Sequence, residues 1–503
     1  MRIKLIKLIQ NELIKIFKRK SIYILLIFSI IAIYIYNNIN PDQNEKIAFN
    51  NDTKDIPIQG METALESMKD NQKEYIDQKA TIEFWKLYNT FKESSWQRFA
   101  LKEEASTHTV EGVYTDCNLD IKKYLYNIYD FEYNQTSEIS LDKYKTSKIK
   151  YNEYVDALNS DDWTSFVNLK IKNLEERKSK SNLSNDEIEE INFEIELYKL
   201  RLEKNINYGY NIQNQYLEQI RTNHYGIKSY KANSYNESQA FINKNINEYE
   251  KRLNLCKYAI ENNIEKDISN EINLIYENEI DARISFIRTF EHFDILLVII
   301  IIYIATTIIT EETNKKTIKN LLTKPHKRST ILISKILACI ITLIISMIVI
   351  CIAQYFIGGI IYGFESYDLE YIGYDFIASK VFTMNLFKFI FLTGIAKLPM
   401  YIIITLFCIF IGIINNNTSM SMILTLIIFL ISNTLLTEWS KVDALSTIGR
   451  FFITNNWDFS TYLFGDTSYI SGVTLNSSIV IFLIYLLLLL FLSIYGFNKK
   501  EIN

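Results

Sequence analysis

Two long apolar runs that enclose a short charged segment constrain this chain more than any other feature of its sequence. The runs cover residues 294–309 and 331–361, and each is long enough to cross a lipid bilayer. Between them lies Ile309–Lys335, which we call the charged segment. A segment enclosed in this way lies at one face of a membrane, so we expect it to have a function at that surface.

The apolar residues are concentrated at the two ends of the sequence. Residues 1–39 and 291–503 are rich in Ile and Leu, whereas residues 40–290, which we call the insert, are rich in Asn, Glu, Lys and Tyr. The insert carries 33 Lys and Arg against 44 Asp and Glu, a balance of -11 without a basic stripe, which argues against a nucleic-acid partner. The composition predicts a membrane protein with a large polar insert.

The first 20 residues combine helical spacing of apolar residues with seven positive charges and one Glu. Such a basic amphipathic helix lies in the membrane interface, and its charges keep it on the cytoplasmic side. No small-x-small cleavage site follows the next apolar run, residues 21–39, so we expect a retained first span rather than a signal peptide. The insert is then extracellular.

The insert is predicted to be helical, because it has no proline between Gly60 and Phe290. Ser184 to Glu187 form a capping box, and we expect a helix that starts there and packs antiparallel on the helix containing Trp163. A stripe of Ile and other apolar residues over 242–287 predicts a long, bent helical stalk that leads into the second span.

Three parts of the insert have less definite predictions. Residues 65–85 are expected to form a partner helix descending from the first span, and residues 106–160 have too weak a periodicity to assign. Cys117 and Cys256 are either a disulfide or two free thiols, and the sequence leaves both alternatives open.

Beyond the charged segment we expect four more spans and three loops. The acidic stretch Gly363–Phe376 is predicted to be an external loop, and residues 385–396 an interfacial helix before Pro399, which suits the first turn of a span. The Asn-rich residues 415–419 form an inner turn, and residues 437–476 an outer loop. The spans are expected at about residues 331–362, 399–414, 420–436 and 477–497.

The predicted fold class is an all-α membrane protein with six transmembrane helices and a large helical extracytoplasmic domain between the first two. An even number of spans places both termini and the charged segment in the cytoplasm. The predicted divisions are residues 1–20, 21–39, 40–290, 291–309, 310–330 and 331–503.

Signatures of catalysis are absent from the sequence. No Gly-Lys dipeptide occurs, so the chain has no Walker A phosphate loop, and no GxSxG motif marks a nucleophile. The histidines lie far apart without metal-ligand spacing, and we predict no metal site. They are His108, His224, His292 and His326.

The charged segment itself is predicted to contain a short amphipathic helix that ends at Pro325. Glu311 and Glu312 stand at the end of the second span, and the apolar face that follows includes Leu321 and Leu322. The alternative is an ordinary basic cytoplasmic loop. Topology alone, however, requires neither the two acids nor the apolar face.

The chain resembles the membrane subunits of ABC-2 permeases in three places. These are NELIKIFKRKS (Asn11–Ser21), E-x4-T-I-x2-L-L-x2-P-x2-R-x6-K (Glu312–Lys335) and FNKKEI (Phe497–Ile502). It is most similar to Gram-positive permeases associated with resistance to bacteriocins or peptide antibiotics and with sodium extrusion. It departs from the common pattern at Lys316, where glycine is frequent, and at His326 and Lys327, and the insert is far longer than the usual first outer loop.

The resemblance implies an elbow helix at the N-terminus and a coupling helix that docks into a separate ATPase subunit. That subunit would hold ATP and magnesium, so no cofactor is expected in this chain, and a second or homologous permease would complete the exporter. The elbow residues are Asn11, Glu12, Lys15, Lys18 and Arg19. The coupling residues are Glu311, Glu312, Lys316, Thr317, Ile318, Leu321, Leu322, Pro325 and Arg328.

Four polar residues within the spans have several interpretations. Gln354 and Asn433 are candidates for a transport path or a partner contact, or for a plain interhelical hydrogen bond. Lys335 and Lys397 lie near span ends, where we expect their amines to snorkel to the interface. Snorkelling makes the two lysines poor candidates for a transport path.

We therefore predict a multi-pass exporter permease of a bacterial plasma membrane, in contact with lipid. An antimicrobial peptide or lipid-like compound is the first substrate expectation, and sodium ions are the second. The main alternative is a membrane-anchored helical stalk that senses an external ligand without transport, and a secondary carrier is disfavoured because the spans lack paired acids or repeats. The insert would be a receptor for a peptide or envelope ligand, a lid, a docking stalk or a solvated spacer.

Overall fold

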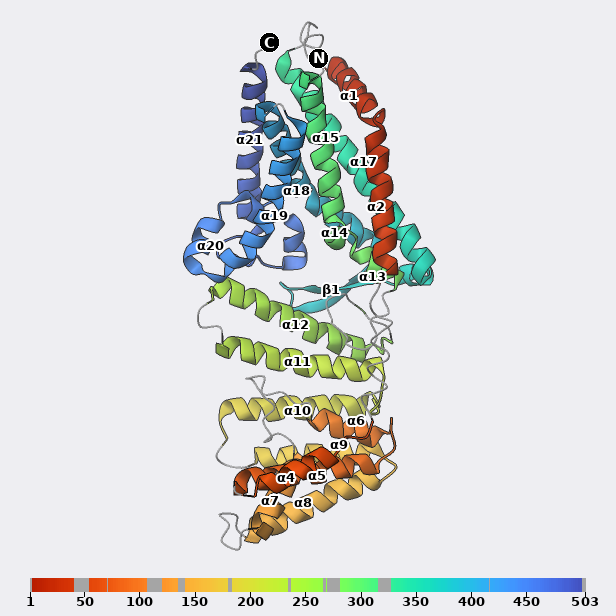
Figure 1. Ribbon diagram of the computed structural model, residues 1–503, viewed down its shortest axis with the longest axis vertical. Helices are drawn as coiled ribbons and strands as arrows, with labels where there is room; N and C mark the ends of the chain where they lie inside the picture. Colours follow the sequence, from red (N-terminus) through yellow and green to blue (C-terminus); the bar gives the residue numbers. More distant parts are fainter. Residues whose placement is uncertain are drawn as a thin grey trace.

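The computed structural model describes residues 2–39, 54–69, 71–105, 120–133, 141–179, 183–233, 237–265, 268, 281–314, 327–415 and 417–499. The molecule is elongated, with a bundle of long helices at one end and the insert at the other (Figure 1). Both chain termini lie at the end of the bundle that is remote from the insert. Most of the described residues are helical, which confirms the all-α membrane class.

The membrane half contains ten α-helices, three 3-10 helices and one hairpin among its described residues. The helices are α1 (Arg2–Phe17), α2 (Lys20–Asn38), α13 (Ala282–Ile287), α14 (Thr289–His292), α15 (Asp294–Asn314), α17 (Arg328–Tyr362), α18 (Leu386–Asn415), α19 (Thr418–Lys441), α20 (Asp443–Gly449) and α21 (Leu475–Lys499). The shorter elements are η3 (Glu365–Asp368), β1 (Tyr371–Asp375), β2 (Lys380–Met384), η4 (Ile453–Asn455) and η5 (Phe459–Gly465).

Five helices in the described part of the chain are long and apolar enough to cross a membrane, namely α2, α15, α17, α18 and α21. Helix α19 occupies the expected fifth span and has a shorter apolar part, Thr418–Ile431. The number of six spans therefore stays a prediction. In α15, 72% of the span is buried, against 22% in α2 and 17% in α21. Helix α15 is thus the centre of the bundle, packed against α2, α17, α18 and α19.

The prediction of a separate interfacial helix before Pro399 is wrong. Helix α18 begins at Leu386 and continues through Pro399, because Asn385 caps it and sets its start earlier. The Asn385 Oδ1 atom accepts hydrogen bonds from the backbone N–H groups of Phe387 and Lys388, at 3.0 and 3.2 Å. Proline inside a membrane helix is tolerated where neighbouring groups satisfy the freed backbone.

The acidic stretch after α17 contains an element that the sequence analysis missed. Gly363 ends α17 with a φ of +89°, and an antiparallel hairpin of β1 and β2 follows, in the register Tyr371 opposite Met384. Successive residues of a strand point to opposite faces. Tyr371 and Met384 accordingly pack on the apolar core of the bundle, while Ile372 belongs to a core of the insert. The hairpin is therefore an apolar joint between the two halves.

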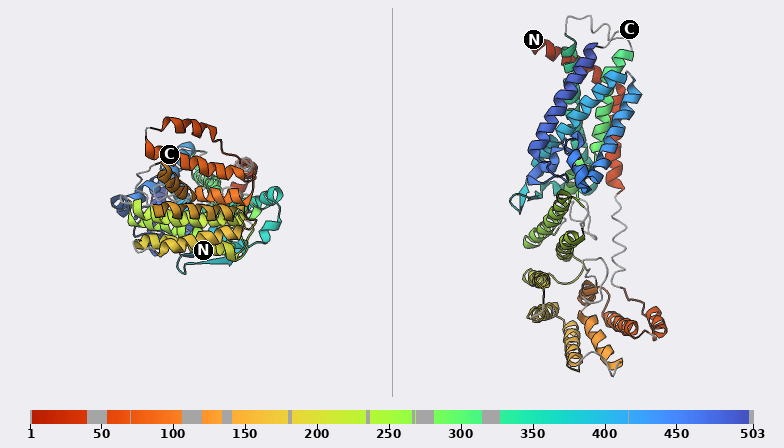
Figure 2. Two further views of the ribbon diagram at one scale, coloured as in Figure 1. Left: turned by 90° about the horizontal axis from the view of Figure 1, so that it is seen from below. Right: turned by 90° about the vertical axis from the view of Figure 1, so that its left-hand side faces the viewer.

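Nine helices of the insert are described before residue 265, and its last residues form α13 and the start of α14 in the membrane half. The nine helices are α4 (Gln59–Ser67), α5 (Gln72–Thr90), α6 (Trp96–Ala105), α7 (Asp120–Tyr133), α8 (Leu141–Asn159), α9 (Trp163–Lys178), α10 (Asn185–Glu203), α11 (Ile212–Asn233) and α12 (Gln239–Glu261). Helices α10, α11 and α12 lie across the long axis of the molecule, one below another, and are seen end-on in the view turned by 90° (Figures 1 and 2).

The capping-box prediction at Ser184 is confirmed. The Ser184 hydroxyl accepts from the Glu187 N–H at 3.2 Å, and the Glu187 carboxylate accepts from the Ser184 N–H at 2.8 Å. Helix α10 starts there and packs against α9 across a short connection. Tyr198 of α10 joins Trp163 and Phe166 of α9 in one apolar core.

The predicted bent stalk over residues 242–287 is wrong. Helix α12 ends at Glu261, where Asn262 caps it and Asn263 adopts a φ of +52°. The helix crosses the molecular axis instead of continuing into the second span (Figure 1). Asparagine tolerates left-handed backbone, so the two asparagines end the helix although the Ile spacing continues beyond them. Cys256 is buried in the core of α11 and α12, while Cys117 lies outside the described residues, so the disulfide question is untested.

Candidate coupling site

Only part of the predicted coupling site lies within the described residues. The apolar face of the charged segment falls outside them, and so do Lys316, Thr317, Ile318, Leu321, Leu322 and Pro325. Glu312 lies in α15, but its side chain is not described. Glu311 and Arg328, which border the charged segment at the ends of α15 and α17, are described together with the elbow helix.

A buried ion pair joins the elbow helix to the third span. Glu12 lies on the apolar face of α1, next to Leu13 and Ile16, which pack into the bundle core. Its carboxylate accepts from Lys335 Nζ of α17 at 2.8 Å and from Lys15 Nζ at 2.7 Å. Side chains of Glu12 and Lys335 are 4% and 1% exposed. A charge this far from water requires a partner, and each of the two provides it for the other.

The expectation that Lys335 snorkels to the interface is wrong. Its Nζ is held inside the bundle by Glu12 and lies 3.4 Å from the carbonyl oxygen of Ile308 in α15. Lys335 thus connects its own helix, α17, to both α1 and α15. The sequence contains one signal for this ion pair, since Glu12 is the single acid beside seven bases in the first 20 residues. A charge on the apolar face of a helix requires a partner of opposite charge.

Arg19 links the bend between α1 and α2 to the C-terminal end of α15. Its guanidinium contacts the Glu311 carboxylate at 3.3 Å and donates to the Thr307 hydroxyl. The hydroxyls of Ser21 and Tyr303 are also hydrogen-bonded across the same two helices. The elbow helix is thereby fixed to both spans that border the charged segment.

The remaining elbow and coupling residues lie around this junction. Arg328, at the start of α17, donates to the carbonyl oxygen of Asn498 near the end of α21, at 2.8 Å. Asn11 on α1 and Lys18, just after its end, are both exposed. The described predicted residues therefore gather at one end of the bundle, the end that holds both termini (Figure 1).

A second buried charge cluster lies at the end of the bundle nearer the insert. Lys397 of α18 contacts Asp294, the first residue of α15, at 2.6 Å and Asp458 at 3.1 Å. The Tyr401 hydroxyl also donates to Asp294. Snorkelling is therefore wrong for Lys397 as well, since its amine is paired within the protein. The cluster ties α15 and α18 to the loop before η5.

Gln354 lies in a buried polar network rather than alone. Its amide accepts from Asn37 of α2 at 3.2 Å and donates to the Ser285 carbonyl oxygen of α13 at 3.0 Å. These hydrogen bonds join α2, α13 and α17 where the bundle meets the insert. Asn433 lies in α19, but its side chain is not described. The transport role of both residues stays a prediction.

A further ion pair joins the insert to the membrane half. Lys244 of α12 contacts Asp466, just after η5, at 2.5 Å and Glu248 at 2.8 Å. Its ammonium also lies 5.7 Å from the centre of the Phe376 ring. Burial disfavours the charged amine, but attraction to Asp466 and Glu248 outweighs burial and raises the pKa of Lys244. The contact therefore stays ionic at neutral pH.

The buried charged groups of the described membrane half form ion pairs between helices. No group of three or more His, Cys, Asp or Glu residues in the described part of the chain is arranged to hold a metal ion. These pairs connect elements far apart in sequence. Glu12 and Lys335 lie at the end of the bundle that holds the termini, and Lys397 lies at the end nearer the insert. Such contacts allow a displacement at one end to move several helices together.

Comparison with known proteins identifies a family. The family described as ABC-2 family transporter protein matches residues 6–502, which includes the insert. No curated protein and no solved structure matches the chain. Because the family covers nearly the whole sequence, from the elbow helix to the end of the last span, this chain belongs to the ABC-2 family of transporter proteins.

Proposed function

We propose that this chain is the transmembrane permease subunit of an ATP-driven exporter and is energised by a separate ATPase subunit that docks on the charged segment. The observation that carries the proposal is the Glu12–Lys335 ion pair with the neighbouring Arg19–Glu311 contact. Together they fix the elbow helix to the two spans that emerge from the charged segment. Family membership supports the need for an ATPase partner.

The coupling step follows from this arrangement. An ATPase that pushes on the charged segment displaces the ends of α15 and α17, which border it. Because Lys335 ties α17 to α1, and Arg19 ties α15 to the bend that follows α1, the elbow helix moves with both spans as one body. Helix α15 is the buried centre of the bundle, so its displacement reaches α18 and the Lys397 cluster at the other end.

The proposed setting is a bacterial plasma membrane with both termini in the cytoplasm and the insert outside. The basic N-terminal helix supports this orientation. Apolar side chains on the outer faces of α2 and α21, such as Phe28 and Phe491, are 59% and 66% exposed. Surfaces of this kind suit lipid and a second copy of the permease or a homologous one.

The proposed substrate is an antimicrobial peptide or a lipid-like compound, with sodium ions as the alternative. The first is supported by the resemblance to resistance permeases and by the large insert, which a permease for a small ion does not require. A deletion strain tested against a panel of peptide antibiotics and a sodium challenge would discriminate the two. Unchanged growth under both conditions would contradict both substrates.

The docking proposal is tested by weakening the charged segment. The triple substitution Leu321→Ala, Leu322→Ala and Glu312→Gln should abolish co-purification of the ATPase and transport, while the protein still inserts in the membrane. The matched control is Ile377→Ala in the hairpin turn, which is 85% exposed and lies toward the insert. Retained ATPase binding by the triple variant would refute the docking site, and the lack of any co-purifying ATPase with the unaltered chain would favour a non-transporting stalk.

A further inference from the structure

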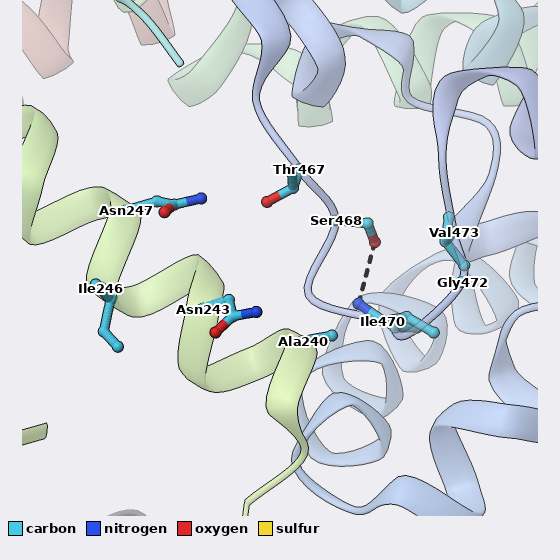
Figure 3. A pocket seen from close by; sticks show the side chains of 9 residues that line it. All are labelled: Ala240, Asn243, Ile246, Asn247, Thr467, Ser468, Ile470, Gly472 and Val473. Carbon is cyan, nitrogen blue, oxygen red and sulfur yellow. Dashed lines mark hydrogen bonds between the residues drawn. The ribbon is translucent and has the colours of Figure 1, made fainter. Parts of the chain in front are cut away.

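A pocket lies where the insert meets the membrane half. One wall is α12, and the other is the loop that follows η5 (Figure 3). Its volume is about 360 Å³, within the range of pockets that enclose small ligands. The pocket is adjacent to the Lys244–Asp466 ion pair, since Lys244 follows the lining residue Asn243 and Asp466 precedes the lining residue Thr467.

The lining combines uncharged polar groups with aliphatic ones. Asn243 and Asn247 present carboxamides from α12, and Thr467 and Ser468 present hydroxyls from the loop (Figure 3). The Ser468 hydroxyl accepts a hydrogen bond from the Ile470 N–H at 3.2 Å. The aliphatic side chains of Ile246 and Ile470 complete the walls.

We propose that this pocket binds a short, uncharged segment of a peptide, and this inference rests on the proposed export of peptides. The Asn243 Oδ1 atom accepts from the Gln239 carboxamide at 2.8 Å, so the peptide site depends on Asn247. Its carboxamide offers a donor and an acceptor, the same pair that a peptide group requires. The aliphatic walls suit an apolar side chain of the ligand. A phosphate or carboxylate ligand would require a charged lining residue, and the pocket has none. Sugar rings commonly favour aromatic lining residues, and the pocket has none of these either.

Peptide binding here would act on the contact between the two halves. The ligand touches α12 and the loop after η5 at once, so it stabilises the arrangement in which they lie together. The same loop leads through Thr474 into α21, and the same helix packs on the hairpin. Occupancy of the pocket is thereby sensed by the membrane bundle.

The test uses the full chain, purified in lipid nanodiscs, and the blocked tripeptide acetyl-Leu-Gly-Leu-amide. We expect a dissociation constant between about 10 μM and about 1 mM, because the pocket is open and the ligand small. Ile246→Trp fills the pocket and Asn247→Leu removes one carboxamide at similar size. Each should weaken binding at least about tenfold. Asn254→Ala removes a carboxamide from the same helix outside the pocket and should leave binding within about twofold.

Three results would overturn the inference. They are no binding of the tripeptide to the unaltered chain, unchanged binding by Ile246→Trp and Asn247→Leu when both melt like the unaltered chain, and preferential binding of maltotriose. Co-purification of the ATPase is measured on the same preparation, so the two proposals fail separately. An ATPase without tripeptide binding removes only the pocket assignment, whereas tripeptide binding without an ATPase removes only the exporter.

Discussion

The buried charges of the bundle and those of the insert are organised differently. In the bundle, Glu12 and Lys335 form a pair between helices that are 323 residues apart, with almost no exposure. In the insert, Glu103 of α6 is shared by Arg201 and Arg221 from α10 and α11, at 3.1 and 2.9 Å, and is 14% exposed. In the bundle, the only other partner of Glu12 among the described residues is Lys15, and the Glu12–Lys335 pair is nearly closed to water. In the insert, Glu103 is partly exposed, and Arg221 also contacts Glu194 and Glu218.

The largest effect is expected from breaking the bundle pair. Lys335→Met leaves the buried Glu12 carboxylate with only Lys15, which should destabilise the bundle by about 3–5 kcal/mol. The measurement is thermal unfolding in nanodiscs, read as the shift in apparent melting temperature. Adding Glu12→Leu to Lys335→Met should recover most of the loss, because no unpaired charge then remains.

The control for this prediction is Lys388→Met, which removes an exposed lysine from the start of α18. It should shift the melting temperature little, since exposed charges contribute about 0–1 kcal/mol. If the double variant were as unstable as the sum of its two single variants, the pair would not be the reason for the loss.

A smaller effect is expected from the insert network. Glu103→Gln leaves Arg201 and Arg221 less well compensated, but Arg221 keeps its contact with Glu194 at 3.1 Å. We expect a loss of about 2–3 kcal/mol in the free energy of opening, read from hydrogen exchange of α10 and α11 amides. A loss as large as that of Lys335→Met would contradict the difference drawn between the two regions.

The Glu103 carboxylate should also make the stability of the insert depend on pH. Burial opposes ionisation of Glu103, but the charges of Arg201 and Arg221 outweigh it and lower its pKa from 4.5 to about 2. The unfolded insert therefore binds more protons in this interval, and stability is lost as the pH falls from about 4.5 through about 2. Hydrogen exchange of the insert amides across this pH range should show the loss of stability. The part of the loss that is due to Glu103 should be absent in Glu103→Gln.

The contact between the regions should depend moderately on Lys244. Lys244→Met removes the ion pair with Asp466 and leaves the apolar hairpin joint intact, so we expect a loss of about 1–2 kcal/mol. Faster hydrogen exchange in residues 466–473 and in α12, with unchanged exchange in α5–α9, would be the signature. Equal acceleration throughout the insert would mean that Lys244 stabilises its fold rather than its contact.

The smallest effect is expected at the start of α10. Ser184→Ala removes a cap that accepts from the Glu187 N–H and should cost about 1 kcal/mol of local stability. Ser179→Ala is the matched control, because that hydroxyl donates back to a carbonyl oxygen at a helix end. Equal exchange rates of the first α10 amides in the two variants would contradict the capping role.

The sequence predicted those features of the fold that depend on local interactions, namely the positions of apolar helices and one helix start. Apolar runs fixed the positions of α2, α15, α17 and α21, and the Ser184 motif fixed the start of α10 to the residue. These features depend on neighbours within a few residues or on the thickness of a membrane, so a single sequence contains them.

The missed features depend on contacts between distant segments. Lys335 and Lys397 were assigned to the interface because their partners, Glu12 and Asp294, lie far away in the sequence. The hairpin was missed because its two faces pack on two different cores, so no simple alternation of polar and apolar residues marks it. The end of α12 was missed because apolar spacing continued past the residues that break the helix.

The central claim is that a separate ATPase subunit docks on the charged segment and transmits the energy of ATP hydrolysis through it. A cross-link tests this claim most directly. Leu321→Cys is placed in a chain whose five natural cysteines are replaced, and membranes are treated with a short thiol-to-amine cross-linker. We predict a nucleotide-dependent cross-link from Leu321→Cys to an ATPase with a Walker A motif. We predict no cross-link to that ATPase from Ile377→Cys in the hairpin turn. A cross-link from position 377 but not from position 321, or no ATPase at either, would contradict it.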